Sequence, residues 1–368
     1  MSVEAVLGSL QPLLRPRSVL LIGELPGTEE FPGLIARLAR SAVAQGLAVT
    51  VGLEVACSEQ TRLDRAVDAA VESGLDSDEA LLGLAFAQSG PWWRRADRFQ
   101  DGRSSRAMLD LVSTLVGLAG AGGDVAIVAA DGPWVAPGSP VPLELLGILE
   151  QPRDEVMATC LLDAIDRRPK AVTLALAGVE HTRCLDTGGE SAAGRAGGAD
   201  GESGAGRADG AGDVGGAGGA RGAGGGIRSA DGLDGAPVCR FPGPFGPPAQ
   251  TGPPGGPDQP GVPGPAGDAT PAVEPGAAGV GARLGAGPGP VRPFGQLVRA
   301  WHPETIALRG RAGGGTAWRL DADFGLGSAA DVAPDPLPEG AHWTDTPGRD
   351  GHHGYVHVGP VTASYPAG

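Results

Sequence analysis

Four short apolar runs of the sequence, each with the character of a buried β-strand, end in a polar residue that can act as an acid, a base or a metal ligand. These residues are Glu24, Glu54, Asp131 and His181. A carboxylate together with an imidazole can activate a water molecule by general base catalysis. Parallel strands end at the same edge of a sheet, which is where open α/β sheets bind their ligands. We therefore expect the four side chains to form one site.

Two arginines belong to the same predicted site. Arg103 precedes a predicted helix over 106–118, and Arg153 begins a predicted helix over 153–166. A cation is unfavourable at a helix N-terminus, so the position of Arg103 predicts an anionic partner, for which Glu24 and Glu54 are the candidates. Arginines can also hold an anionic substrate group or stabilise an oxyanion. The alternative is that the arginines only pair with the carboxylates and hold loops in place.

Trp92 and Trp93 stand in a predicted loop beside Arg94 and Arg95. Aromatic side chains in loops above the edge of a sheet often line ligand pockets, which would make both tryptophans substrate-binding residues. Packing of the loop by the two indoles is the alternative.

The carboxylates and His181 would also suit a divalent metal, although two glutamates and one histidine make a sparse ligand set. His352, His353 and His357 near the C-terminus form a second histidine group, for which we predict an exposed turn and strand. No cofactor is required by the sequence, and a divalent metal or haem stays open as an alternative.

The element that must position the first two carboxylates is Ser18–Glu54. It is predicted to form a strand over 19–22, a helix over 29–45 and a strand over 48–53. Further apolar strands are predicted over 124–130 and 171–177. Uninterrupted apolar strands that alternate with helices indicate a parallel sheet covered on both faces. The predicted fold class is therefore α/β, with a mostly parallel central sheet flanked by helices.

Glycine and proline are concentrated in one segment of the 368-residue chain, which holds 65 glycines and 34 prolines in all. Residues 186–290 consist almost entirely of Gly, Ala, Pro, Asp, Ser and Arg, a composition that cannot bury enough apolar surface to order itself. We predict a disordered insertion there. Residues 1–185 and 291–368 are then predicted to form a single discontinuous domain, with a helix over 294–300 and strands over 305–309, 316–320 and 355–359.

The net charge of −15 disfavours a nucleic-acid or anionic-membrane partner, because both require a basic surface. Four cysteines without a CxxC pair do not indicate a disulfide framework. We expect neither a signal peptide nor a transmembrane segment, so the cytoplasm is the expected location. The sequence contains no G-x-S-x-G elbow, Walker A motif or Rossmann fingerprint. The remaining partner class is a small molecule.

The ordered segments LIGELPGT, VGLE, DGRSS, RDEVMA and ALAGVEHTR resemble the erythromycin-esterase-like, haem-uptake (ChaN-like) and Tiki superfamily. Its members have a strand ending Gly-Glu-x-His-Gly-Thr, a second strand ending in Glu and a later strand ending Gly-Asn-x-His. The resemblance covers about residues 18–183 and the last seventy or so. It implies that Glu24, Glu54 and His181 are catalytic and that Arg103 and Arg153 are the family's arginines.

Two positions depart from the superfamily pattern. Pro26 stands where the first strand motif has its histidine, and Val179 stands where the later motif has its asparagine. The resemblance thus leaves two hypotheses: a hydrolase of small ester- or amide-type substrates, or a degenerate member that binds a small molecule or haem without turnover. A third is an interaction protein that acts through its insertion.

Overall fold

The computed structural model describes residues 3–95, 101–135, 138–141, 143–184, 292–320 and 327–367. All of them belong to one compact unit, Met1–Asp186 with Cys239–Gly368, whereas a second unit, Thr187–Val238, lies outside the described residues. The predicted disordered insertion over 186–290 also lies outside them.

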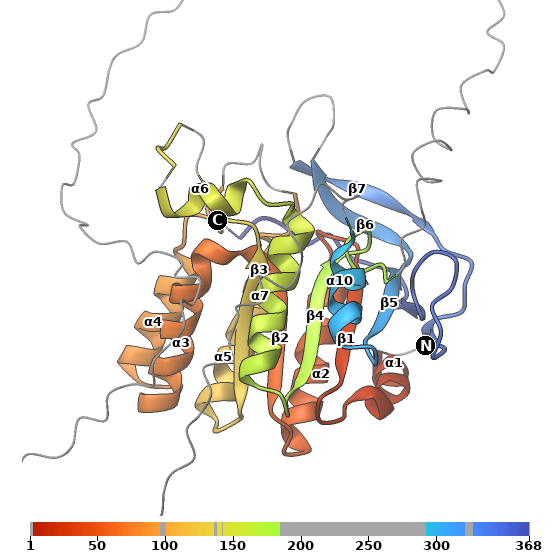
Figure 1. Cartoon of the computed structure of the whole chain (residues 1–368), viewed down its shortest axis with the longest axis horizontal. Helices are drawn as coiled ribbons and strands as arrows, with labels where there is room; N and C mark the ends of the chain where they lie inside the picture. The colour runs from red at the N-terminus through yellow and green to blue at the C-terminus, as the bar shows by residue number, and fades with distance from the viewer. Residues whose placement is uncertain are drawn as a thin grey trace, which may run out of the picture. The chain divides into compact units, whose positions relative to one another are not determined.

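The centre of the unit is a seven-stranded sheet with the order β3-β2-β4-β1-β5-β9-β8 (Figure 1). Every neighbouring pair is parallel except β8 and β9, which confirms the predicted α/β fold with a mostly parallel sheet. The strands are β1 (Val19–Glu24), β2 (Val49–Ala56), β3 (Val125–Asp131), β4 (Val172–Gly178), β5 (Ile306–Arg311), β8 (Gly340–Trp343) and β9 (Gly354–His357).

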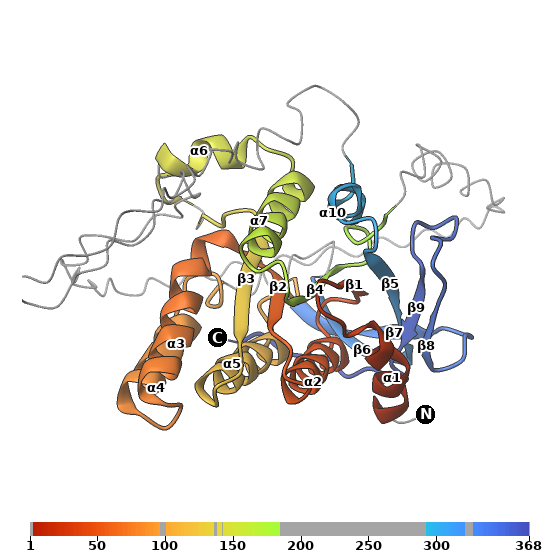
Figure 2. The ribbon, with the colours of Figure 1, turned by 60° about the horizontal axis from the view of Figure 1, so that its bottom comes forward.

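Helices cover both faces of this sheet. Figure 2 shows α7 and α10 on one side and α2 and α5 on the other, with α3 and α4 beside α5. The helices are α1 (Val3–Leu10), α2 (Glu30–Ala44), α3 (Gln60–Ser73), α4 (Asp78–Gln88), α5 (Arg106–Gly120), α6 (Leu143–Leu149), α7 (Arg153–Arg167) and α10 (Phe294–Trp301). No helix among the described residues is long and apolar enough to cross a bilayer.

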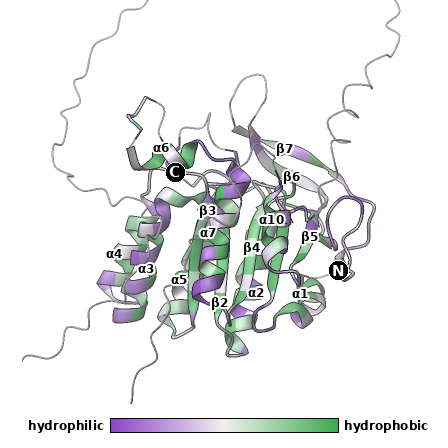
Figure 3. Ribbon diagram, viewed as in Figure 1, coloured by the Kyte–Doolittle hydropathy of each residue, from purple (hydrophilic) through white to green (hydrophobic). Residues whose placement is uncertain are grey.

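Alternate residues of the strands enter two separate apolar cores. In β1, Leu20 and Ile22 pack with α2 and α5, whereas Val19 and Leu21 pack with α7 and α10. Burial on both faces explains why the strands read as uninterrupted apolar runs, and Figure 3 shows the central strands mostly in green.

Local turns and contacts set the starts of two helices and the pairing of one strand. A 3-10 turn over Cys57–Glu59 precedes α3. The cap of α5 is Ser105, whose side chain accepts a hydrogen bond from the amide of Met108. The strand predicted over 316–320 does not join the main sheet: β6 (Gly313–Leu320) pairs antiparallel with β7 (Gly327–Pro334) in a separate ribbon.

This ribbon and the C-terminal segment cover the turn that follows β1. The amides of Trp318 and Ser364 both donate to the carbonyl of Gly27, at 2.8 and 2.9 Å. The amide of Arg106 at the start of α5 donates to the carbonyl of Tyr365 at 2.8 Å. Segments from the C-terminal part of the chain therefore fix two loops of the N-terminal half, those that follow β1 and precede α5.

Candidate functional site

The end of β4 separates the two predicted catalytic glutamates. β4 pairs with β1 on one side, where Gly178 is opposite Glu24, and with β2 on the other. The Gly178 amide donates to Glu54 Oε2 at 2.7 Å. Glu54 itself lies within β2 rather than at its end, next to an irregularity in the β2–β3 register between Leu53 and Ala56. The carboxyl edge thus brings both glutamates together, as predicted.

Glu54 is the centre of an ion-pair cluster. Its side chain is fully buried, and Oε1 pairs with Arg103 Nε at 2.5 Å and with Arg153 Nη2. Asp131 accepts two hydrogen bonds from Arg153, at 2.6 and 2.7 Å. Asp101 pairs with Arg103 Nη1 at 2.6 Å. Between Glu24 and Glu54, the two candidate partners of Arg103, the structure shows the ion pair with Glu54.

Glu24 is in a different environment. It is 2% exposed, and its Oε1 has no hydrogen-bond partner among the described residues. Burial raises the pKa of Glu24 to about 8, the nearby charge of Glu54 adds to this, and Arg103 offsets part of it. Glu24 is therefore mainly protonated at neutral pH, so it can donate a proton.

His181 is oriented by a carboxylate that the sequence analysis did not assign. Its Nδ1 lies 2.7 Å from Asp154 Oδ1, which also accepts a hydrogen bond from the Phe294 amide. Because the carboxylate accepts, Nδ1 carries the proton and Nε2 keeps its lone pair in the neutral ring. Nε2 is 3.7 Å from Glu54 Oε1. Asp154 follows Arg153 in the RDEVMA segment. The sequence shows that a carboxylate stands there, but it does not show that Asp154 binds His181.

Gly178 leaves space between these groups. A Cβ atom built there would lie 3.5 Å from Glu54 Oε2, 3.5 Å from His181 Cδ2 and 3.8 Å from Arg103 Nη2. The side chains of Arg103, Arg153 and His181 are 19, 37 and 19% exposed, so solvent reaches the edge above the buried Glu54.

Trp92 and Trp93 lie in the core rather than at an open edge. They are 2 and 1% exposed and pack edge to face with ring centroids 4.6 Å apart. The guanidinium of Arg95 lies 4.6 Å from the Trp92 ring centroid. Their burial favours the packing alternative over the predicted contact with a substrate.

The prediction of an exposed C-terminal histidine group is wrong. His352, His353 and His357 are all buried, between 2 and 3% exposed. His353 Nδ1 accepts a hydrogen bond from the Ala307 amide of β5, so pairing of the final strand with β5 draws these rings inward. No group of three or more His, Cys, Asp or Glu side chains among the described residues is arranged to hold a metal ion.

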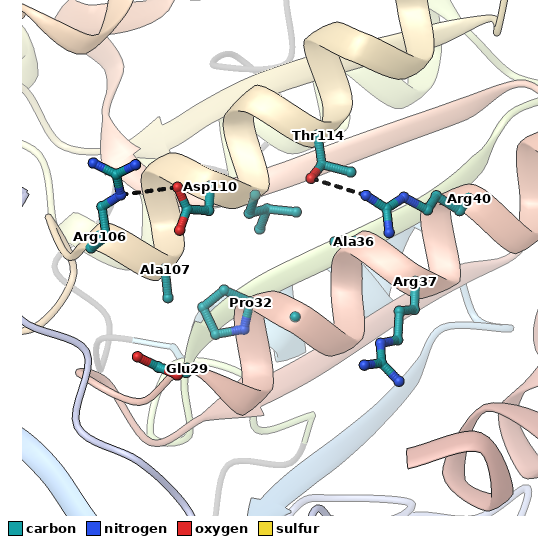
Figure 4. Close-up of a pocket in the computed structure, with 11 residues that line it drawn as sticks. Glu29, Pro32, Ala36, Arg37, Arg40, Arg106, Ala107, Asp110 and Thr114 are labelled. Carbon is teal, nitrogen blue, oxygen red and sulfur yellow. Dashed lines mark hydrogen bonds and ion pairs between the residues drawn. The ribbon is translucent and has the colours of Figure 1, made fainter.

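Two surface hollows lie away from this edge. One, of about 300 Å³, runs between α2 and α5; Figure 4 shows Arg40 directed to Thr114 and Arg106 paired with Asp110 along it. The other, of about 220 Å³, lies beside β5 and the residues preceding β9. Neither hollow is lined by the six polar residues predicted for the site.

The comparisons with known proteins assign no family. No protein-family model and no curated protein sequence matches the chain. A solved structure titled "The structure of the type III effector HopBA1" is similar at 16% identity with a TM-score of 0.31, covering 49% of this chain and 73% of that chain. A similarity this low assigns neither fold family nor function.

Proposed function

We propose that this protein is a hydrolase that activates water at the carboxyl edge of its sheet and cleaves a small ester- or amide-type substrate. The observation that carries the proposal is the hydrogen bond between Asp154 and His181, which leaves Nε2 as a base beside two guanidinium groups. The resemblance places another histidine at position 26, where this chain has Pro26. The role of base therefore falls to His181.

In the proposed reaction, His181 Nε2 removes a proton from water while the water oxygen attacks the substrate's carbonyl carbon. Asp154 keeps the ring in the required tautomer and stabilises the imidazolium that forms. The exposed edges of Arg103 and Arg153 stabilise the oxyanion. Glu24, protonated at neutral pH, gives its proton to the leaving alkoxide or amine and is reprotonated through solvent from His181.

Asp154→Asn tests the base. With a substrate found in a screen of small esters and amides, we expect kcat to fall by about 10²-fold, because the amide no longer stabilises the imidazolium. The matched control is Asp110→Asn on the exposed face of α5, which should retain wild-type kcat. Equal rates for Asp154→Asn and the control, at unchanged thermal stability, would show that His181 is not an oriented base.

Gly178→Ala tests whether the space among Glu54, His181 and Arg103 is used. The added methyl group makes ordinary contacts of 3.5 Å or more, so we expect the fold to persist and kcat/KM to fall by about tenfold as the methyl displaces water or substrate. Gly147→Ala in α6, where a Cβ meets nothing within 4 Å, is the control. Unchanged kcat/KM in Gly178→Ala would place the reaction elsewhere.

The second candidate function is binding without turnover, of haem or another small molecule. The observation that favours it is that Glu54 Oε1 forms ion pairs with both Arg103 and Arg153. This carboxylate oxygen is then not available to accept a proton or to orient a water molecule. Haem titration separates the two functions. A Soret shift that disappears in His181→Ala, together with no hydrolysis across the substrate screen, would support binding.

A further inference from the structure

Helix α4 carries apolar side chains on every side, although only one side of it packs against the domain. Its sequence, DEALLGLAFAQ, has no polar residue between Glu79 and Gln88. Ala80 and Ala87 are buried, and α3 approaches closely at Gly83. A helix that is apolar all round is normally covered on all sides, so the outer side of α4 calls for a partner.

The outer side of α4 exposes two adjacent leucines. Leu81 and Leu82 are 54 and 70% exposed, and Ala85, one turn further along, is exposed as well. Val71 and Leu75, near the connection between α3 and α4, are also exposed. Figures 1 and 2 show α4 at the margin of the domain, packed on α3. A contiguous apolar surface of this kind marks an interaction site.

Opposite charges lie at the two ends of this leucine surface. Asp78 and Glu79, in the first turn of α4, are exposed carboxylates. At the other end, the guanidinium groups of Arg62 and Arg65 lie 4.2 and 5.6 Å from the centroid of the Phe86 ring. Neither Glu79 nor Arg65 has an ion-pair partner among the described residues. The surface therefore has an acidic end, an apolar middle and a basic end.

A surface with this order of charges is complementary to itself. In a dimer with a two-fold axis across the middle of α4, each helix runs antiparallel to its copy and each end meets the opposite end of the other chain. Leu81 and Leu82 then pack near the axis, and the acidic first turn faces the arginines of the copy. The antiparallel arrangement also sets the positive N-terminus of each helix dipole beside the negative C-terminus of the other.

We propose that α4 is the contact surface of a homodimer, in which two copies of the chain pack antiparallel through Leu81 and Leu82. The charges favour a second copy over an unrelated apolar partner, because they match the same surface turned end to end. One helix face is smaller than the roughly 800 Å² per partner of a stable complex, so the dimer should be weak and concentration-dependent. Nothing in this proposal depends on the hydrolase function.

Analytical ultracentrifugation of the full chain tests the dimer. We expect the average mass to rise from one chain toward two between about 5 and 500 µM, the range in which weak complexes form. Leu82→Glu changes an exposed side chain, so the fold should persist while the dimer dissociation constant rises by about tenfold or more, because the charge would be buried between the helices. Leu146→Glu, at an exposed leucine of α6, is the matched control and should dimerise like wild type.

Charge reversal tests the antiparallel arrangement. Glu79→Arg and Arg65→Glu should each weaken the dimer by about threefold to tenfold, because each sets like charges against each other in both halves of the interface. The double variant reverses both partners and should dimerise more tightly than either single variant. Thermal unfolding of each variant checks that the domain is folded.

Three results would overturn the proposal. The first is a chain that stays monomeric over the whole concentration range. The second is a dimer that Leu82→Glu weakens no more than Leu146→Glu does, which would place the association elsewhere in the chain. The third is a double variant that dimerises no more tightly than the single variants, which would show that the charged ends of α4 do not meet.

Discussion

At the scale of single residues, two glutamates at one sheet edge are given different states by their neighbours. Glu54 is met by two guanidinium groups and a backbone amide, and these compensate a buried negative charge. Glu24 has no such partner at Oε1 in the part of the chain that the structure describes, and burial raises its pKa to about 8. The sequence predicts that both carboxylates reach the edge, because each follows an apolar strand. It cannot predict which one the arginines pair with, since this depends on how the loop over 101–105 packs.

Glu24→Gln should remove a pH-dependent loss of stability. The pKa of Glu24 is about 8 in the folded chain and near 4.5 when unfolded, so between these pH values the folded state binds more protons and the wild-type free energy of unfolding falls as pH rises. Glutamine stays neutral and shows no such loss. In urea denaturation, wild type and Glu24→Gln should have similar free energies of unfolding at pH 4. At pH 9 the variant should be more stable than wild type by a few kcal/mol.

Glu72→Gln on the exposed surface of α3 is the control for that measurement. The difference in free energy of unfolding between this variant and wild type should not change with pH. A Glu24→Gln difference that is equally flat would show that Glu24 is ionised at neutral pH in the folded protein. It would then be unable to donate a proton to a leaving group.

At the scale of elements, the long apolar strands and amphipathic helices were predicted well, and the short elements were not. β1 and β4 are uninterrupted apolar runs because both faces are buried. β7, with the sequence GSAADVAP, has low β propensity and becomes a strand only by pairing with β6. β8 has four residues and lies at the sheet edge. Asp154 was missed as a site residue for a related reason, because it meets His181 through tertiary packing.

The N-cap of α4 gives a test at this scale. Ser77 accepts a hydrogen bond from the Ala80 amide at 3.0 Å. Ser77→Ala should lower the free energy of unfolding by about 1 kcal/mol, because an amide of the first turn loses its acceptor. Ser77→Asp keeps an acceptor and should retain wild-type stability in the same urea titration. If both variants lose stability equally, the side-chain bond contributes nothing and the loop before α4 is sensitive for another reason.

At the scale of the whole molecule, the described sheet is built from segments on both sides of the predicted insertion. β1 pairs with β4, which precedes the insertion, and with β5, which follows it. The residues that flank the predicted insertion lie close together in the domain, since the Gly295 amide donates to the His181 carbonyl at 2.8 Å. A flexible insertion between such close ends costs stability only through loop closure, which grows slowly with length.

Replacement of residues 186–290 by a Gly/Ser linker of about ten residues should therefore preserve the fold and raise the free energy of unfolding by about 2 kcal/mol, because each halving of a flexible loop recovers about 0.6 kcal/mol. Urea denaturation measures the change. A linker of scrambled composition and full length is the control, and it should match wild type. If the short linker lowers stability, residues of the insertion make native contacts with the domain and the prediction of disorder is wrong. If stability rises but hydrolysis or ligand binding is lost, the insertion acts on function without contributing to the fold, as the interaction hypothesis requires.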